Sequence, residues 1–218
     1  MKGVAHAARL LLLIMLPGLM ILSGCAGDPR EALPPTVPVP PEEGTTSSSL
    51  DCTMAQGVAR LVCDDAELAA LDLQLKEVFE AAEHQTPEAQ HSTLQAIQYG
   101  WAKDRDECWE QDDKRGCVAE TYHRRIAELQ ATYRLVEQRG PVRFACGDRP
   151  ANEVTVTWFD TKPKTLIAER GDSESLMYRQ TGTGPDYRGR NESLSEQQDA
   201  ITIVWGHGAP QITCQVAP

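Results

Sequence analysis

The chain has 218 residues, which is enough for one or two small domains. Hydrophobic residues make up 41% of it and charged residues 24%, so it can bury a core and is not disordered over its whole length. The formal net charge of −11 argues against nucleic acid or an anionic membrane surface as a partner, because both require clusters of Lys and Arg. Seven cysteines in so short a chain indicate an oxidising compartment.

Residues 1–25 have the layout of an export signal peptide. Two basic residues precede an apolar stretch, residues 10–22, which is too short for a transmembrane helix because such a helix needs ~20 apolar residues. The stretch ends in Leu-Ser-Gly-Cys, which resembles the lipobox of bacterial lipoproteins. The resemblance implies cleavage before Cys25 and a lipid on the Cys25 thiol. We therefore expect the N-terminus to anchor the protein to a membrane of the bacterial cell envelope.

Residues 26–50 are expected to form a disordered tether. They contain six prolines, two glycines and a run of three serines, but almost no large apolar side chain, so they cannot bury a core. The residue after the lipidated cysteine, Ala26, is not the aspartate that retains lipoproteins of enteric bacteria at the inner membrane. We therefore expect the protein at the periplasmic face of the outer membrane.

Residues 51–139 have the apolar spacing of α-helices. One helix, with Asp64 or Asp65 as its N-cap, is indicated by apolar residues at steps of three and four: Leu68, Leu71, Leu75, Val78 and Ala82. The last helix of the segment is indicated in the same way by Val118, Tyr122, Ile126, Leu129, Tyr133 and Val136. The segment is therefore predicted to be all-helical.

A further helix is predicted between these two. Thr86 is its expected N-cap and Pro87 its first residue, with Leu94, Ile97 and Trp101 on one face. The pair Gly140-Pro141 breaks regular structure and is expected to end the helical domain.

Residues 142–218 change to the two-residue period of β-strands. Apolar residues alternate in three runs, which are Val142, Phe144 and Cys146, then Val154, Val156 and Trp158, then Ile201, Ile203 and Trp205. Glycine-rich turns separate these runs, which is typical of a small antiparallel β-barrel or sandwich. The predicted fold class is α+β in two domains: a small disulfide-stapled helical domain followed by the barrel.

Six cysteines remain when Cys25 carries the lipid, and this even number fits three disulfides. Six cysteines allow 15 pairings, and the sequence alone does not choose among them. We expect neighbours to pair at the helix ends and the last two cysteines to join the ends of the barrel, giving Cys52–Cys63, Cys108–Cys117 and Cys146–Cys214. The net charge is −8 over residues 51–139 and −2 over residues 142–218, so the helical half is the acidic one.

No group of residues supports catalysis. Gly171-Asp172-Ser173 resembles the opening of an esterase family, but no Asp stands three residues before His207, so a turn is the simpler interpretation. The cysteines form no C-x-x-C pair, and the histidines of the helical half lack the four-residue spacing of a zinc site. The carboxylates of Asp104, Asp106 and Glu107 are expected on a solvated face rather than across a cleft. We expect no enzyme, no metal and no cofactor.

The helical half resembles the N-terminal domain of LprI-type lipoproteins. The resemblance is carried by cysteines, aromatic residues and Arg-Ile in a fixed order: Cys52, Cys63, Leu68-x-x-Leu71-Asp72, Trp101-x-x-x-Arg105-Asp106-x-Cys108, Cys117, Tyr122-x-x-Arg125-Ile126 and Glu128-Leu129. One departure is Ala59, where the family often has Glu.

The strand half resembles the MliC family of lipoproteins that inhibit c-type lysozyme. Phe144-Ala145-Cys146-Gly147-Asp148 matches the family's opening, Val154-x-Val156 its next strand and Cys214-Gln215 its end. Thr183-Gly184-Pro185-Asp186-Tyr187 matches the inhibitory motif Ser-Gly-x-x-Tyr, with Thr in place of Ser. In the family this loop enters the lysozyme cleft, where the hydroxyl and a lysine engage the two catalytic carboxylates.

The resemblance implies a lysozyme-binding loop made of Thr183, Gly184 and Tyr187. The family's lysine falls at Gln197, or at Glu196 in a shifted register, and neither is cationic, so Arg188 and Arg190 are the expected substitutes. The main hypothesis is therefore a lipid-anchored inhibitor of c-type lysozyme, a basic protein that an acidic chain attracts. The alternative is a non-catalytic scaffold or adaptor that binds another envelope component. A hydrolase with an unrecognised site is a third, weaker hypothesis.

Overall fold

A computed structural model describes residues 48–147 and 152–218. Cys25, the signal peptide predicted at 1–25, most of the predicted tether and Asp148 lie outside these residues. Within the described part of the chain, no helix is long and apolar enough to cross a membrane.

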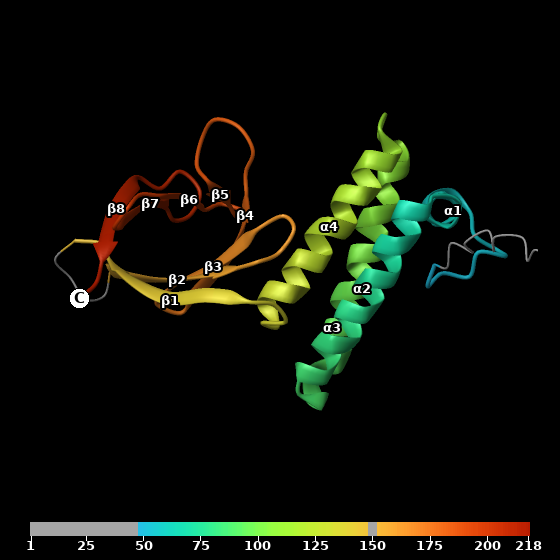
Figure 1. Ribbon diagram of the computed structural model, residues 1–218, viewed down its shortest axis with the longest axis horizontal. Helices are drawn as coiled ribbons and strands as arrows, with labels where there is room; N and C mark the ends of the chain where they lie inside the picture. The colour runs from blue at the N-terminus through green and yellow to red at the C-terminus, as the bar shows by residue number, and fades with distance from the viewer. Residues whose placement is uncertain (1–47, 148–151) are drawn as a thin grey trace, which may run out of the picture. The chain divides into compact units, whose positions relative to one another are not determined.

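The first half of the described chain is helical, as predicted. Four α-helices and one short 3₁₀ segment follow one another in the residues described: α1 (Gly57–Asp64), α2 (Ala66–Gln85), α3 (Glu88–Asp106), η1 (Glu107–Glu110) and α4 (Lys114–Thr132) (Figure 1). Asp65 is the N-cap of α2, and its side chain accepts hydrogen bonds from the backbone N–H groups of Glu67 and Leu68. The helices bury a core to which each predicted apolar stripe contributes: Val58, Val62, Leu68, Leu75, Ala82, Leu94, Val118, Tyr122, Ile126 and Leu129.

Two local predictions in this half are wrong. Thr86 does not cap α3; its hydroxyl donates to the carbonyl of Ala82 (2.8 Å), so it ends α2, and Pro87 is the residue that precedes α3. Ile97 is 51% exposed, because Gln98 takes the inner position on α3 and accepts a hydrogen bond from Arg125 (2.9 Å). An apolar residue therefore lies outside while a polar one faces a buried arginine.

The second half is a closed antiparallel barrel of eight strands joined in sequence order, with β1 also pairing with β8 (Figure 1). The strands are β1 (Gln138–Ala145), β2 (Glu153–Phe159), β3 (Thr165–Arg170), β4 (Ser173–Arg179), β5 (Tyr187–Arg188), β6 (Ser193–Glu196), β7 (Ala200–Val204) and β8 (Gln211–Val216). Closure removes the sheet edges that invite aggregation. The α+β prediction, with helices followed by a barrel, is confirmed.

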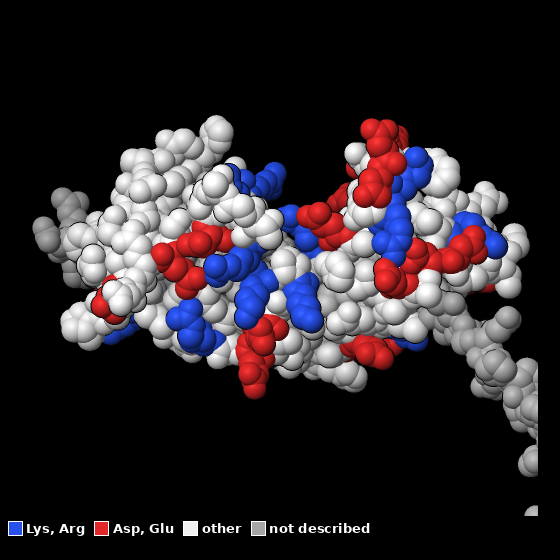
Figure 2. Space-filling view, turned by 45° about the horizontal axis from the view of Figure 1, so that its top comes forward, with Lys and Arg blue, Asp and Glu red and all other residues white. Residues whose placement is uncertain are grey.

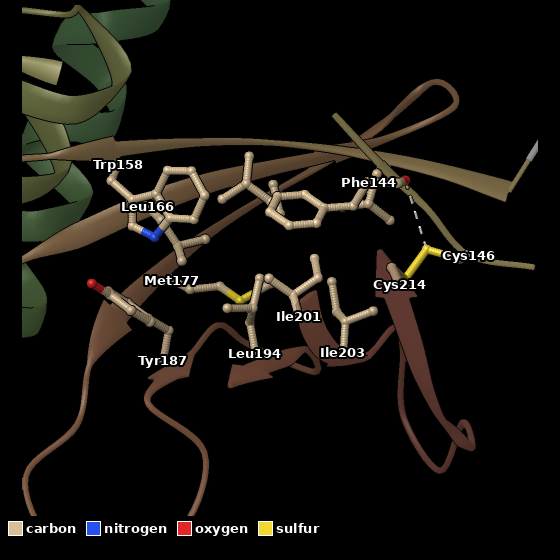
Figure 3. Close-up of a cluster of buried hydrophobic side chains, with 13 residues drawn as sticks. Phe144, Cys146, Trp158, Leu166, Met177, Tyr187, Leu194, Ile201, Ile203 and Cys214 are labelled. Atoms are coloured by element: carbon tan, nitrogen blue, oxygen red, sulfur yellow. Dashed lines mark hydrogen bonds between the residues drawn. A yellow bond between two sulfur atoms is a disulfide. The ribbon is translucent and has the colours of Figure 1, made fainter. Parts of the chain in front are cut away.

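The alternating runs supply the inside of the barrel. Phe144, Val154, Val156, Trp158, Ile201 and Ile203 are buried there together with residues from β3, β4 and β6 (Figure 3). The expected domain boundary at Gly140-Pro141 is wrong, because β1 begins at Gln138 and the pair lies within it. The register of β1 with β2 shifts between Arg139 and Val142, and such an irregularity is where a strand tolerates proline.

The three disulfides join Cys52 to Cys63, Cys108 to Cys117 and Cys146 to Cys214, which are the expected pairs. The first two lie in the helical half, and the third closes a loop of 68 residues between the ends of the barrel. Each half of the chain therefore carries its own cross-links and its own core. A third, small apolar cluster, made of Ala131, Phe159 and Ile167, was not predicted.

Tyr178 on β4 is the residue from which we expect a pH effect on stability. Its ring lies under the guanidinium of Arg124 (4.4 Å to the ring centroid), and burial raises the pKa of Tyr178 to about 12. A tyrosine in the unfolded chain ionises near ~10, so this contribution to the free energy of unfolding is complete below about pH 10 and is lost as the pH rises toward 12.

Chemical denaturation at pH 9 and above pH 11 checks this expectation. The fall in unfolding free energy should be smaller for Tyr178→Phe than for the wild type, while the control Tyr99→Phe, at a side chain that is 65% exposed, should behave as the wild type. An equal fall in all three proteins would show that the tyrosine at 178 is not responsible.

Candidate functional site

The residues that carry the LprI resemblance form a buried polar network among the helices. Nη1 of Arg105, which is only 6% exposed, donates to the hydroxyl of Tyr122 (3.0 Å), and that hydroxyl donates to Oδ1 of Asp72 (2.9 Å). Trp101 packs edge-on against the Tyr122 ring at 5.2 Å, and burial raises the pKa of Tyr122, which keeps its proton. Asp104, Asp106 and Glu107 are exposed, as expected, whereas Arg105 between them is buried.

The network also holds the end of the predicted tether. Oδ2 of Asp72 accepts hydrogen bonds from the hydroxyl of Ser48 (2.9 Å) and the backbone N–H of Ser49 (2.6 Å), and Leu50 packs against the helical core. Residues 48–50 are therefore attached to the helical domain, and the tether is shorter at this end than predicted. Every partner in the network is an internal one, so these residues stabilise the domain and are not a binding surface.

The sequence-predicted binding loop lies between β4 and β5, residues 180–186, and projects from the barrel (Figure 1). Its two ends are joined by a backbone hydrogen bond from Gln180 N to the carbonyl of Asp186 (2.8 Å). Gly184 has φ +128°, a conformation that side chains rarely adopt, so the turn at this point requires glycine. The motif's Thr-Gly pair therefore stands at the tip of a loop whose base is closed.

Thr183 and Gly184 are both exposed at this tip. The guanidinium of Arg188 lies near Gly184, because a Cβ on Gly184 would stand 3.8 Å from Arg188 Nη2. The loop and the first residues of β5 thus expose a hydroxyl, from Thr183, and a cation, from Arg188, which are the two kinds of group that the resemblance implies for carboxylate recognition. Arg190 is exposed in the turn between β5 and β6.

Two of the predicted binding residues, Tyr187 and Gln197, lie outside the loop at 180–186. Tyr187 is 3% exposed and belongs to the barrel core, where its hydroxyl accepts a hydrogen bond from Arg179 (3.4 Å). Gln197 is exposed, but its amide donates to the hydroxyl of Thr202 (3.0 Å) rather than toward the loop. Tyr187 therefore supports the base of the loop from within the barrel core.

A clamp of charged residues holds the base of the loop, and the sequence did not reveal it. Arg179 Nη1 donates to Glu196 Oε2 (3.4 Å), and Oδ2 of Asp186 accepts from the backbone N–H of Glu196 (2.8 Å). Glu196 also accepts from Arg139 Nη2 (3.1 Å), which is 57 residues away in the chain. The hydrogen bond with the Tyr187 hydroxyl raises the pKa of Arg179, so this arginine stays charged. Glu196 is thus neutralised internally.

Charge on the surface is mixed. On the face drawn in Figure 2, basic side chains lie next to acidic ones and do not form a broad field of one sign. In the described part of the chain, no group of three or more His, Cys, Asp or Glu side chains is placed to hold a metal ion. The described chain thus consists of a helical half and a β-barrel, each stabilised by its own disulfides, and the loop at 180–186 projects from the barrel.

Comparison with known proteins places this arrangement in a family. The chain is 30% identical over 198 residues to Lipoprotein LprI of Mycobacterium bovis (strain ATCC BAA-935 / AF2122/97), which covers 87% of this chain and 91% of that protein. The same values hold for Lipoprotein LprI of Mycobacterium tuberculosis strains CDC 1551 / Oshkosh and ATCC 25618 / H37Rv. The chain belongs to the LprI lipoprotein family, and the similarity extends over both halves. No protein-family model and no solved structure matches it.

Proposed function

We propose that the protein is a lipid-anchored inhibitor of c-type lysozyme that acts by blocking the enzyme's cleft, without catalysis of its own. The observation that carries the proposal is the loop at 180–186, which exposes Thr183 at its tip and has the Arg188 guanidinium next to the adjoining Gly184. Lysozyme-type hydrolysis needs two carboxylates, and a hydroxyl and a cation delivered together satisfy both through charge-assisted hydrogen bonds. Family membership supports an envelope lipoprotein, and lipidation at Cys25 belongs to the proposal.

The closed base of the loop favours inhibition. The backbone hydrogen bond between Gln180 and Asp186, together with the buried Tyr187, orders the loop before a partner arrives. A preordered loop loses less conformational entropy on binding, so more of the contact energy appears as affinity. The acidic chain, at −11, would also attract a basic enzyme and raise the association rate.

Thr183→Val tests the role of the hydroxyl, because valine keeps the branched shape and removes the donor. The expected cost is about 1–3 kcal/mol, or roughly 5- to 150-fold in affinity for a c-type lysozyme, since an enzyme carboxylate is left buried without a partner. Thr181→Val, at an exposed threonine in the same loop, is the matched control and should leave affinity within about twofold. Equal effects of the two changes would contradict a specific role for Thr183.

Arg188→Gln tests the cation. It should weaken binding more at low salt than at high salt, because added ions screen an exposed charge. Arg190→Gln should weaken binding less, since Arg190 lies in the next turn and not beside Gly184. Gln197→Lys should strengthen inhibition if this position lies within reach of the enzyme, as the resemblance implies. Titration calorimetry at two salt concentrations measures all three.

The scaffold hypothesis makes a different prediction. Its support is that Gln197 is hydrogen-bonded to Thr202 and that no lysine stands at the family's position. If the protein is an adaptor for another envelope component, the mature protein does not bind lysozyme, and neither Thr183→Val nor Arg188→Gln changes anything in the assay.

A further inference from the structure

One mouth of the barrel carries charged side chains on the interior face of the sheet. In the strand register, Arg139 is opposite Trp158 and Arg179 is opposite Tyr187. Directly opposed residues of an antiparallel pair share a face, and Trp158 and Tyr187 belong to the barrel core. The two arginines therefore continue the interior face to the point where the barrel opens.

The mouth encloses a pocket of about 410 Å³. This volume lies in the range of about 300–1,000 Å³ typical of small-molecule sites, which occur in the mouths of β-barrels. The walls combine aromatic rings with charges of both signs. The lining residues come from the ends of five strands and the turns beside them: Glu137, Gln138, Arg139, Trp158, Phe159, Asp160, Lys164, Arg179, Tyr187 and Glu196.

A buried hydrogen-bond donor in this wall lacks an acceptor. Trp158 is 7% exposed, and its Nε1 has no hydrogen-bond partner among the described residues. Figure 3 shows this nitrogen at the same end of the core cluster as the hydroxyl of Tyr187. An indole N–H can only donate, and leaving it unpaired in the interior is costly. An acceptor supplied by a ligand would remove that cost.

The two guanidinium groups nearby have donors to spare. Arg139 donates from Nη2 to Glu196 and Arg179 donates from Nη1 to the same carboxylate, so the two cations share one anion. The Arg139 guanidinium also lies over the Trp158 ring, 3.9 Å from its centroid, on a side chain that is 65% exposed. A ligand that reaches the indole N–H therefore also meets this guanidinium.

The other charged side chains of the lining balance the charge of the pocket. Lys164 pairs with Asp160 (3.1 Å), and Glu137 adds a carboxylate that offsets one guanidinium. Three basic and three acidic side chains line the pocket in all. Their charges cancel, so a simple anion gains little electrostatic binding energy there. A ligand that carries both signs fits better, with its carboxylate against the arginines and its ammonium toward Glu137.

We propose that this mouth binds a small zwitterion of the size of an amino acid or dipeptide, whose carboxylate accepts from Trp158 Nε1 and Arg139. The site lies at the same end of the barrel as the loop at 180–186 and shares Arg179, Tyr187 and Glu196 with the base of that loop, but it does not include Thr183 or Arg188. The proposal therefore stands or falls independently of lysozyme inhibition.

The test is a titration of the ¹⁵N-labelled mature protein with dialanine, followed by the four tryptophan indole N–H signals. Trp158→Phe assigns the Trp158 signal. We expect this signal alone to move downfield and saturate, and we expect dialanine amide, which lacks the carboxylate, to bind at least about tenfold more weakly. Arg139→Gln should weaken dialanine by a similar factor, and Arg143→Gln, an exposed arginine farther along β1, should have no effect.

Thermal unfolding of each variant shows whether the barrel remains folded. If Trp158→Phe does not fold, the comparison of Arg139→Gln with Arg143→Gln still tests the site. The proposal is overturned if the Trp158 signal stays fixed at millimolar dialanine. It is equally overturned if the amide binds as well as the acid, or if Arg143→Gln weakens binding as much as Arg139→Gln.

Discussion

Replacing Cys146 and Cys214 together by alanine should lower the free energy of unfolding of the barrel by about 4 kcal/mol. The disulfide closes a loop of 68 residues, and in the chain-entropy model the stabilisation grows with the logarithm of that length. A barrel of fewer than 90 residues has little hydrophobic burial to spare, so a loss of this size should leave it partly unfolded at 37 °C. Guanidinium denaturation of the variant and the wild type, followed by tryptophan fluorescence, measures the difference.

The matched comparison is the double alanine variant of Cys52 and Cys63. That disulfide closes a separation of only 11 residues, for which the same model gives about 3 kcal/mol, and the loss should fall on the helical half. A barrel that loses less than about 1 kcal/mol without Cys146–Cys214 would show that the strands hold themselves together without the cross-link.

Asp72→Ala should lower the free energy of unfolding of the helical half by about 3 kcal/mol. The carboxylate accepts three hydrogen bonds, from the Tyr122 hydroxyl, the Ser48 hydroxyl and the Ser49 backbone, and each is worth about 1 kcal/mol. The change also leaves the buried Arg105 and Tyr122 hydroxyl without the acceptor at the end of their chain. Denaturation monitored by circular dichroism at 222 nm reports the helical loss.

Asp64→Ala is the control for this change. Asp64 is an aspartate on α1 whose ion pair with Arg60 is more than half exposed on both sides, so its removal should cost no more than about 0.5 kcal/mol. If both alanine variants lose the same stability, the buried network is not what holds the helices together.

The regular parts of the fold could be predicted because their periods are plain in the sequence. Leu68, Leu75 and Ala82 mark the buried stripe of α2, and Val154, Val156 and Trp158 mark the interior face of β2. Strands β5 and β6 are only two and four residues long, which is too short for an alternation to be visible. For the second half of the chain the sequence therefore predicted the fold class, a small antiparallel barrel or sandwich, but not the individual strands.

The burial of Arg105 was not predicted, because a search for periodicity considers only the spacing of apolar residues. Arg105 stands four residues after Trp101 and therefore on the same face of α3, a spacing that would have indicated burial had the pair been read together. The Thr-Gly tip of the loop was found from its motif, whereas the clamp of Arg179, Glu196 and Arg139 depends on barrel closure. These three residues come from three different strands, so no local sequence pattern predicts that they meet.

The most direct test of the proposed function is lysis of bacterial cell walls by a c-type lysozyme, followed by turbidity with increasing mature protein added. Wild-type protein should slow lysis in a saturable way as its concentration reaches that of the enzyme. Thr183→Val should require roughly 5- to 150-fold more protein for the same inhibition, and Thr181→Val about the same amount as the wild type. Lysis that proceeds unchanged with wild-type protein in excess, or inhibition that is insensitive to Thr183→Val, would contradict the proposed function.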